Sequence, residues 1–149
     1  MEKKINFWYL YRKNYYDIEI KKFDKELLGD GSSKFVQLYI NDRPVIIAGN
    51  DSYHRDLLKI YFKNINLKFN TRLNISKDQI PLEEGENYRL VGAGRVRLLD
   101  DKLNFYDSSS DYIAKISGTH KQNLEEIFGP ENLDEDEEGR FGPSFFVNI

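Results

Sequence analysis

The chain has 149 residues, a formal net charge of −3 and a hydrophobic content of 40%. This length and composition fit one globular domain with a sizeable core, and the acidic balance argues against nucleic-acid binding. The absence of cysteine excludes disulfides, thiolate catalysis and cysteine-based zinc sites, and only two histidines are present. We therefore expect no metal or other cofactor.

No apolar run approaches the ~20 residues that a membrane-spanning helix needs. Residues 1–6 also lack the apolar stretch of a signal peptide. We therefore expect a cytoplasmic protein with no membrane partner.

The first part of the chain predicts a β-hairpin. Residues 5–11 are aromatic and β-branched on both faces, which favours a well-covered strand, and Lys13-Asn14 fits a turn. Residues 16–21 then alternate apolar and charged side chains, as a half-buried strand does. A short helical turn over 23–28 completes an N-terminal hairpin extension, residues 1–28, and Gly29 to Ser32 form a loop.

The central part predicts a second hairpin followed by a helix. Residues 34–40 alternate as a strand, a tight turn over 41–44 follows, and residues 45–48 form the return strand. A helix over about 51–64 comes next, because apolar residues from Leu57 onward recur at helical spacing. Residues 66–81 fit a loop with a short strand.

The last part predicts two strands, a helix and a final strand. Residues 88–99 form a strand whose small central residues, Gly92-Ala93-Gly94, indicate a bulge or a close backbone approach. Residues 102–106 return as its partner, 107–112 form a polar loop, and 120–128 form a helix. An acidic loop, 131–139, precedes the strand 144–149.

Strands outnumber helices in this reading, and neither an internal repeat nor a domain linker is visible. We therefore predict a single α+β domain over 1–149, with one mixed or antiparallel β-sheet covered by two main helices.

His54 is the first candidate for chemistry, because it falls in the first turn of the helix predicted over 51–64. Asp51 or Ser52 fits the capping position, and a helix start offers free N–H donors and a partial positive charge that favour anions. That field also favours a neutral imidazole that accepts a proton, whereas Asp51 and Asp56 act in the opposite direction. The alternative is a helix-surface or half-buried histidine without chemistry.

Four further stretches stand out when they are taken together: Asp30 to Val36, Ser52 to Leu57, Gly92 to Val96 and Lys102 to Tyr112. In their order and spacing they resemble the Janus family, the phosphohistidine phosphatases. The similarity covers roughly residues 30–149 and leaves the N-terminal hairpin outside it.

The resemblance implies a phosphohistidine phosphatase-like fold and a metal-independent phosphohydrolase acting on a phosphorylated protein or a small phosphoramidate. His54 would be the general base, and Lys34 and Arg95 would face the phosphoryl oxygens. Ser109 and the N–H group of Ser110 would belong to the loop that binds phosphate. The structural alternatives are a solvated strand end for Lys34, an ion pair for Arg95 and a polar turn for the serines.

The chain departs from the family pattern at two places. The arginine that the family carries before the catalytic helix would fall near Ala48, and loop glycines are replaced so that carboxylates stand at Asp107 and Asp111. Carboxylates beside a phosphate repel it. These departures favour a second hypothesis, a non-catalytic member of the fold that binds a protein or a small anion, with the aromatic N-terminal hairpin as a contact surface.

Two weaker candidates remain. The run Asp134 to Gly139 begins like a calcium loop, but Phe145 stands where such a loop needs glutamate, so a solvated acidic loop is the preferred interpretation. His120 lies beside the second predicted helix, and we assign it no role.

Overall fold

The computed structural model describes residues 6–14, 17–50, 54–66, 88–106, 108–109, 114–115, 118–136 and 144–148. Within these ranges, the backbone alone is described for 54–55, 108–109, 114–115 and 118–120. The predicted helix start at 51–53, the segment 66–81 beyond its first residue, Asp107, and 110–113 lie outside the described residues.

The fold is α+β, with one eight-stranded sheet in the order β2-β1-β4-β3-β5-β6-β10-β9. Its neighbouring strands are antiparallel except β1 and β4, which are parallel, so the sheet is mixed. The strands are β1 (Phe7–Asn14), β2 (Asp17–Lys22), β3 (Ser33–Ile40), β4 (Arg43–Gly49), β5 (Tyr88–Leu99), β6 (Lys102–Tyr106), β9 (Leu133–Asp136) and β10 (Ser144–Asn148).

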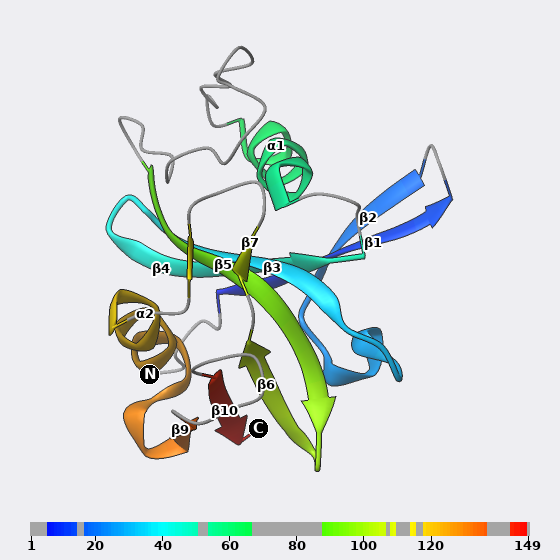
Figure 1. Ribbon diagram of the computed structural model, residues 1–149. Helices are drawn as coiled ribbons and strands as arrows, with labels where there is room; N and C mark the ends of the chain where they lie inside the picture. Colours follow the sequence, from blue (N-terminus) through cyan, green and yellow to red (C-terminus); the bar gives the residue numbers. More distant parts are fainter. Residues whose placement is uncertain are drawn as a thin grey trace.

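The two main helices cover opposite faces of this sheet. Helix α1 (His54–Asn64) packs on β3 and β4 from one side, and α2 (Gly118–Phe128) packs on β3, β4 and β5 from the other (Figure 1). A separate two-stranded pair, β7 (Ser108–Ser109) and β8 (Ala114–Lys115), lies against β5. The 3-10 helices are η1 (Lys25–Leu28) and η2 (Pro130–Asn132). The coarse class predicted from the sequence is therefore confirmed.

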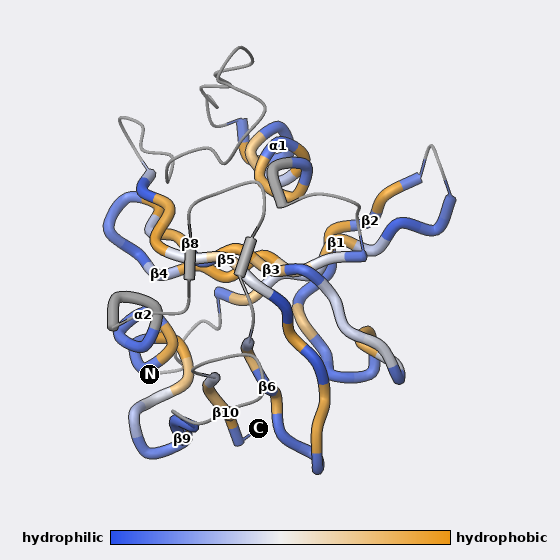
Figure 2. Tube along the Cα trace, viewed as in Figure 1, coloured by the Kyte–Doolittle hydropathy of each residue, from blue (hydrophilic) through white to orange (hydrophobic). Residues whose placement is uncertain are grey.

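Each face of the sheet carries its own apolar core, as the orange central strands in Figure 2 illustrate. The predicted alternation along β3 is correct: Val36 and Leu38 pack under α1, whereas Phe35 packs under α2. On the α2 face a buried amide pair joins the layers, because the Gln37 side chain donates to Asn123 at 3.2 Å. We refer below to the α1 face and the α2 face.

The N-terminal hairpin is an integral part of the sheet. Strand β1 lies between β2 and β4, and Phe7, Tyr9 and Leu10 are each at most 2% exposed. Leu10 belongs to the core of the α1 face, and Phe7 and Tyr9 belong to that of the α2 face. The view of the hairpin as an appended contact surface is therefore corrected for β1, whose apolar residues point to both faces.

Two tight turns and one bulge agree with the sequence analysis. The residues at both turns, Asn41-Asp42 and Asp100-Asp101, have positive φ angles between 49° and 64°, as the turns that suit a two-residue hairpin require. Opposite β3, the register of β5 shifts by one residue beside Gly92, which places a bulge next to the small residues.

Three local predictions were wrong. The turn placed at Lys13-Asn14 is still strand, because β1 continues to Asn14. The acidic loop over 131–139 begins instead with η2 and β9, since the acidic segment pairs with β10 at the sheet edge. The polar loop over 107–112 contains β7, which pairs with β8.

Buried tyrosines give the fold a testable dependence on alkaline pH. Burial raises the pKa values of Tyr9, Tyr39 and Tyr61 above their ordinary value of 10.0. The folded state then holds these protons more tightly than the unfolded state, so the stabilisation is complete below pH ~10 and is lost as pH rises further. We expect the free energy of unfolding, measured by urea titration, to fall above pH ~10.

The variant Tyr61→Phe keeps the ring and removes an ionisable hydroxyl, so its stability should fall less steeply over the same pH range. Equal slopes for the two proteins would contradict the assignment of Tyr61.

Candidate functional site

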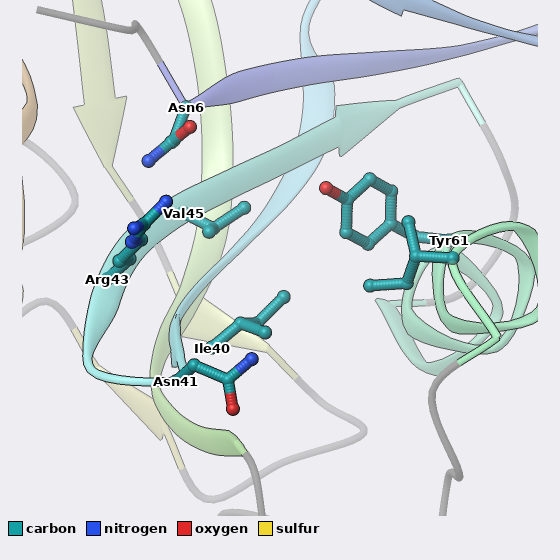
Figure 3. Close-up of a pocket in the computed structure, with 7 residues that line it drawn as sticks. Asn6, Ile40, Asn41, Arg43, Val45 and Tyr61 are labelled. Carbon is teal, nitrogen blue, oxygen red and sulfur yellow. The ribbon is translucent and has the colours of Figure 1, made fainter.

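One hollow in the described part of the chain does not coincide with the residues selected from the sequence. It has a volume of about 470 Å³ and lies between the β3–β4 turn and the end of α1 (Figure 3). Lys34 stands at the opposite end of β3 from Ile40, which lines the hollow, and six residues of extended strand separate them by roughly 20 Å. The predicted phosphate site and this hollow are therefore two separate places in the fold.

The predicted cations lie in one row of residues across the centre of the sheet. Direct cross-strand partners in this row are Leu10, Gly49, Lys34, Arg95 and Tyr106, contributed by β1, β4, β3, β5 and β6 in that order. Directly opposed residues have Cβ atoms about 5 Å apart, so the side chains of Lys34 and Arg95 start as close neighbours.

Both cations point to the face that α1 covers. Lys34 is two residues from Val36 and Arg95 is two residues from Ala93, and both apolar residues pack in the core under α1. The Arg95 guanidinium donates to the Ser32 hydroxyl at 3.3 Å, which ties it to the loop before β3. Lys34 and Arg95 are therefore brought together by the fold although 61 positions separate them in the chain (95 − 34).

Helix α1 packs very closely on the sheet, and this contact fixes the position of its first turn beside the row that contains Lys34 and Arg95. Gly49 faces α1, and a Cβ atom there would lie 2.7 Å from Leu57 Cδ2 and 2.9 Å from the Leu10 carbonyl oxygen. Only glycine lets Leu57 pack this closely on β4. His54 is the first residue of α1, so its backbone begins one short connection after Gly49; its side chain is not among those described.

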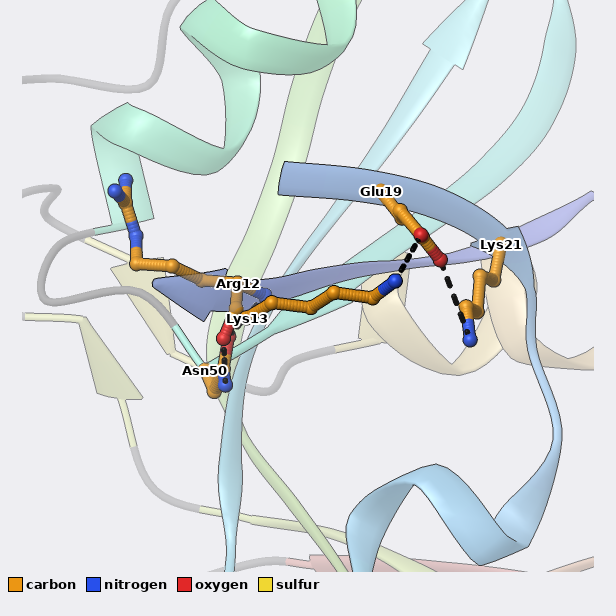
Figure 4. Close-up of polar contacts among 5 residues, drawn as sticks. All are labelled: Arg12, Lys13, Glu19, Lys21 and Asn50. Carbon is orange, nitrogen blue, oxygen red and sulfur yellow. Dashed lines mark hydrogen bonds and ion pairs between the residues drawn. The ribbon is translucent and has the colours of Figure 1, made fainter. Parts of the chain in front are cut away.

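The sequence analysis missed Arg12, a third cation at the same end of the sheet. Its backbone N–H donates to the Asn50 side-chain oxygen at 3.1 Å, and the Asn50 amide donates back to the Arg12 carbonyl at 3.5 Å. Figure 4 shows the Arg12 side chain directed toward the side of α1, while Lys13 turns to Glu19. Only the parallel pairing of β1 with β4 reveals this proximity, and sequence periodicity does not predict a parallel partner.

Ala48 gives no room for a cation at the position that the resemblance assigned to an arginine. Its side chain is fully buried in the core under α2, on the face opposite to Lys34 and Arg95. A charged side chain at 48 would point away from the row described above. Two described cations lie beside the strand end that leads into α1: Lys34 pairs directly with Gly49, and the Arg12 backbone bonds to the Asn50 side chain.

Further along the same face, Arg97 is held firmly in place. Its guanidinium lies 4.4 Å from the centroid of the Tyr106 ring, and its Nε donates to the Asn104 side chain at 3.0 Å. Asn104 in turn donates to the Phe145 carbonyl at 3.4 Å. These contacts extend the positive charge of the face toward β6, in a chain whose net charge is negative.

The predicted serine loop is located only in part. Ser109 lies in β7, whose backbone pairs with β8 and contacts β5, the strand of Arg95. Ser110 lies outside the described residues, and the side chain of Ser109 is not described. The backbone therefore brings Ser109 to the strand of Arg95.

Of the acidic run compared with a calcium loop, residues 134–136 belong to β9 at the sheet edge, and residues 137–139 lie outside the described residues. Asp134 and Glu135 alternate in β9, and each reaches a lysine: Asp134 lies 4.0 Å from Lys102 and Glu135 lies 3.4 Å from Lys121. Neighbouring carboxylates on a strand point to opposite faces, so they do not converge on an ion. Within the described ranges, no group of three or more potential ligand residues could hold a metal ion.

Comparison with protein-family models, with curated proteins and with solved structures found no match. In the described part of the chain, no helix has the length and apolar character to cross a membrane.

The contact between Leu57 and Gly49 can be tested through stability. Gly49→Ala places a methyl group within 2.7 Å of Leu57 and 2.9 Å of backbone, so α1 must shift. We expect a loss of ~1–3 kcal/mol in the free energy of unfolding, measured by urea titration. Gly31→Ala is the matched control, because no atom lies within 4 Å of the added Cβ; a similar loss in both variants would contradict the proposed packing constraint.

Proposed function

We propose that the chain is a metal-independent phosphohydrolase that removes phosphate from phosphohistidine or a related phosphoramidate. The observation that carries this proposal is the direct opposition of Lys34 and Arg95 on the α1 face, one strand from the end of β4. Two cationic side chains that start from directly opposed positions can both reach the oxygens of one anion. The helix that begins at His54 adds free N–H donors to the same end of the sheet.

In the proposed reaction, His54 acts as the general base, and Lys34 and Arg95 stabilise the negative charge of the phosphoryl group. His54 orients a water molecule and accepts its proton while the water oxygen forms a bond to phosphorus. The P–N bond breaks, its electron pair leaves with the imidazole nitrogen of the substrate, the leaving imidazole takes up a proton from solvent, and phosphate is released. Lys34 and Arg95 neutralise the charge on the phosphoryl oxygens, so positioning and electrostatics supply most of the acceleration.

The two histidines of the chain provide a test with a built-in control. His54→Ala should reduce phosphate release from a phosphohistidine peptide by ~10²–10⁴-fold, the usual contribution of a general base. His120→Ala should retain the wild-type rate, because no role is assigned to it. Equal rates for His54→Ala and the wild-type protein would exclude the base role of His54.

A second candidate is a non-catalytic module of the same architecture that binds a protein or a small anion. It is favoured by Ala48, whose position carries no cation on the α1 face, and by the acidic residues Asp107 and Asp111 in the sequence. Arg12 would then complete a binding site with Lys34 and Arg95 rather than assist hydrolysis. Phosphate binding without turnover of the phosphohistidine peptide would favour this candidate over the enzyme.

The enzyme and the anion-binding form of the second candidate both require an anion site, and Arg12 tests how far that site extends. Arg12→Gln should weaken the binding of inorganic phosphate about tenfold in a calorimetric titration, as the loss of one charged hydrogen-bonding partner does. Lys13→Gln removes the same charge one residue away, where the lysine pairs with Glu19 instead, and should leave the affinity within about twofold. Equal weakening by the two variants would place Arg12 outside the site.

A further inference from the structure

A second site is suggested by the hollow between the β3–β4 turn and the C-terminal part of α1. Its lining combines aliphatic side chains, Ile40, Val45 and Ile65, with polar groups at the rim. A volume of about 470 Å³ is within the usual range for small-molecule sites. The hollow lies on the α1 face, at the opposite end of the β3–β4 hairpin from Lys34, so it is separate from the proposed phosphate site.

Tyr61 contributes a hydrogen-bond donor to the lining of the hollow. The residue is only 8% exposed, and its hydroxyl points from α1 across the hollow toward Val45 and Asn6 (Figure 3). The hydroxyl forms no hydrogen bond with any side chain or backbone group in the described ranges. The hydroxyl is therefore available to donate to a bound molecule that supplies an acceptor in the hollow.

The tyrosine is suited to donate rather than to carry charge. Burial is the cause that raises the pKa of Tyr61, so the hydroxyl keeps its proton at neutral pH. It therefore offers a hydrogen to a ligand oxygen and would repel no anion. The ring itself packs in the core of the α1 face, which fixes the direction of the O–H group.

The charge of the lining residues favours a negatively charged ligand. Arg43 lies at the rim, the side chains of Asn6 and Asn41 add amide groups, and none of the described lining residues is acidic. Arg43 makes no ion pair with a described carboxylate. A guanidinium and a phenolic donor around an aliphatic floor match a molecule with an anionic head and an apolar body.

We propose that this hollow binds a small amphiphilic carboxylate, whose head group contacts Arg43 and Tyr61 and whose apolar part covers Ile40, Val45 and Ile65. The Arg43 guanidinium and the Tyr61 hydroxyl donate to the carboxylate oxygens. The apolar part of the ligand covers Ile65, which is 40% exposed in the unliganded chain.

The probe is octanoate, compared with octan-1-ol and octylammonium of the same chain length, in titrations followed by amide chemical shifts of the full chain. Octanoate should shift the amides of Asn41, Arg43 and Ile65 in a saturable way, and the two other probes should bind at least tenfold more weakly. Equal binding of octanoate and octan-1-ol would overturn recognition of the carboxylate. Shifts that are confined to other residues, or that do not saturate, would overturn the site.

Three variants distinguish the effect of losing a proposed donor from the effect of changing the net charge of the chain. Arg43→Gln should weaken octanoate binding about tenfold, and Tyr61→Phe should weaken it several-fold while keeping the ring. Lys59→Gln is the matched control, because it removes one positive charge from α1 outside the lining; its affinity should equal that of the wild-type chain. A loss in Lys59→Gln as large as that in Arg43→Gln would show that only net charge matters and would overturn the proposal.

Discussion

The packing of Leu57 onto Gly49 is the contact on which the arrangement of the α1 face depends. Glycine at the last position of β4 allows the helix to sit closer to the sheet than any side chain would permit. Because Leu57 and Leu58 are both fully buried, the helix cannot slide along the strands without opening the core. The start of α1 is thus fixed beside the row that holds Lys34 and Arg95.

The N-terminal hairpin supports this arrangement from the side. Asn50 bonds to the Arg12 backbone in both directions, which extends the parallel pairing of β1 and β4 by one side-chain link. The chain therefore leaves the sheet toward α1 from an anchored point. A segment that the family resemblance did not cover contributes both core residues and a cation to the candidate site, so the hairpin and the remaining chain form one structural unit.

Local patterns in the sequence account for much of the fold. Period-two alternation gave the two faces of β3 correctly, and the Asn41-Asp42 and Asp100-Asp101 turns follow from residues that tolerate positive φ. Contacts between distant segments were not predictable in this way. The pairing of β1 with β4 and the edge position of β9 depend on which strands lie side by side, and periodicity carries no such information. The family resemblance identified Lys34 and Arg95 as candidate phosphate-binding residues. Arg12 and Tyr61 were not identified, because only the three-dimensional arrangement of the strands and α1 places them at a candidate site.

The two sites share one rigid connection, and its geometry limits how they can influence each other. Helix α1 has 11 residues and a length of about 16 Å, with His54 at one end and Tyr61 near the other. A ligand in the hollow would contact the C-terminal part of α1, whereas an anion beside Lys34 would contact its start. Coupling requires a ligand to favour a second position of the element that links the sites. Leu57, Leu58 and Phe62 hold the helix against the sheet between these ends, so the same packing that positions the proposed phosphate site favours independent binding at the two sites.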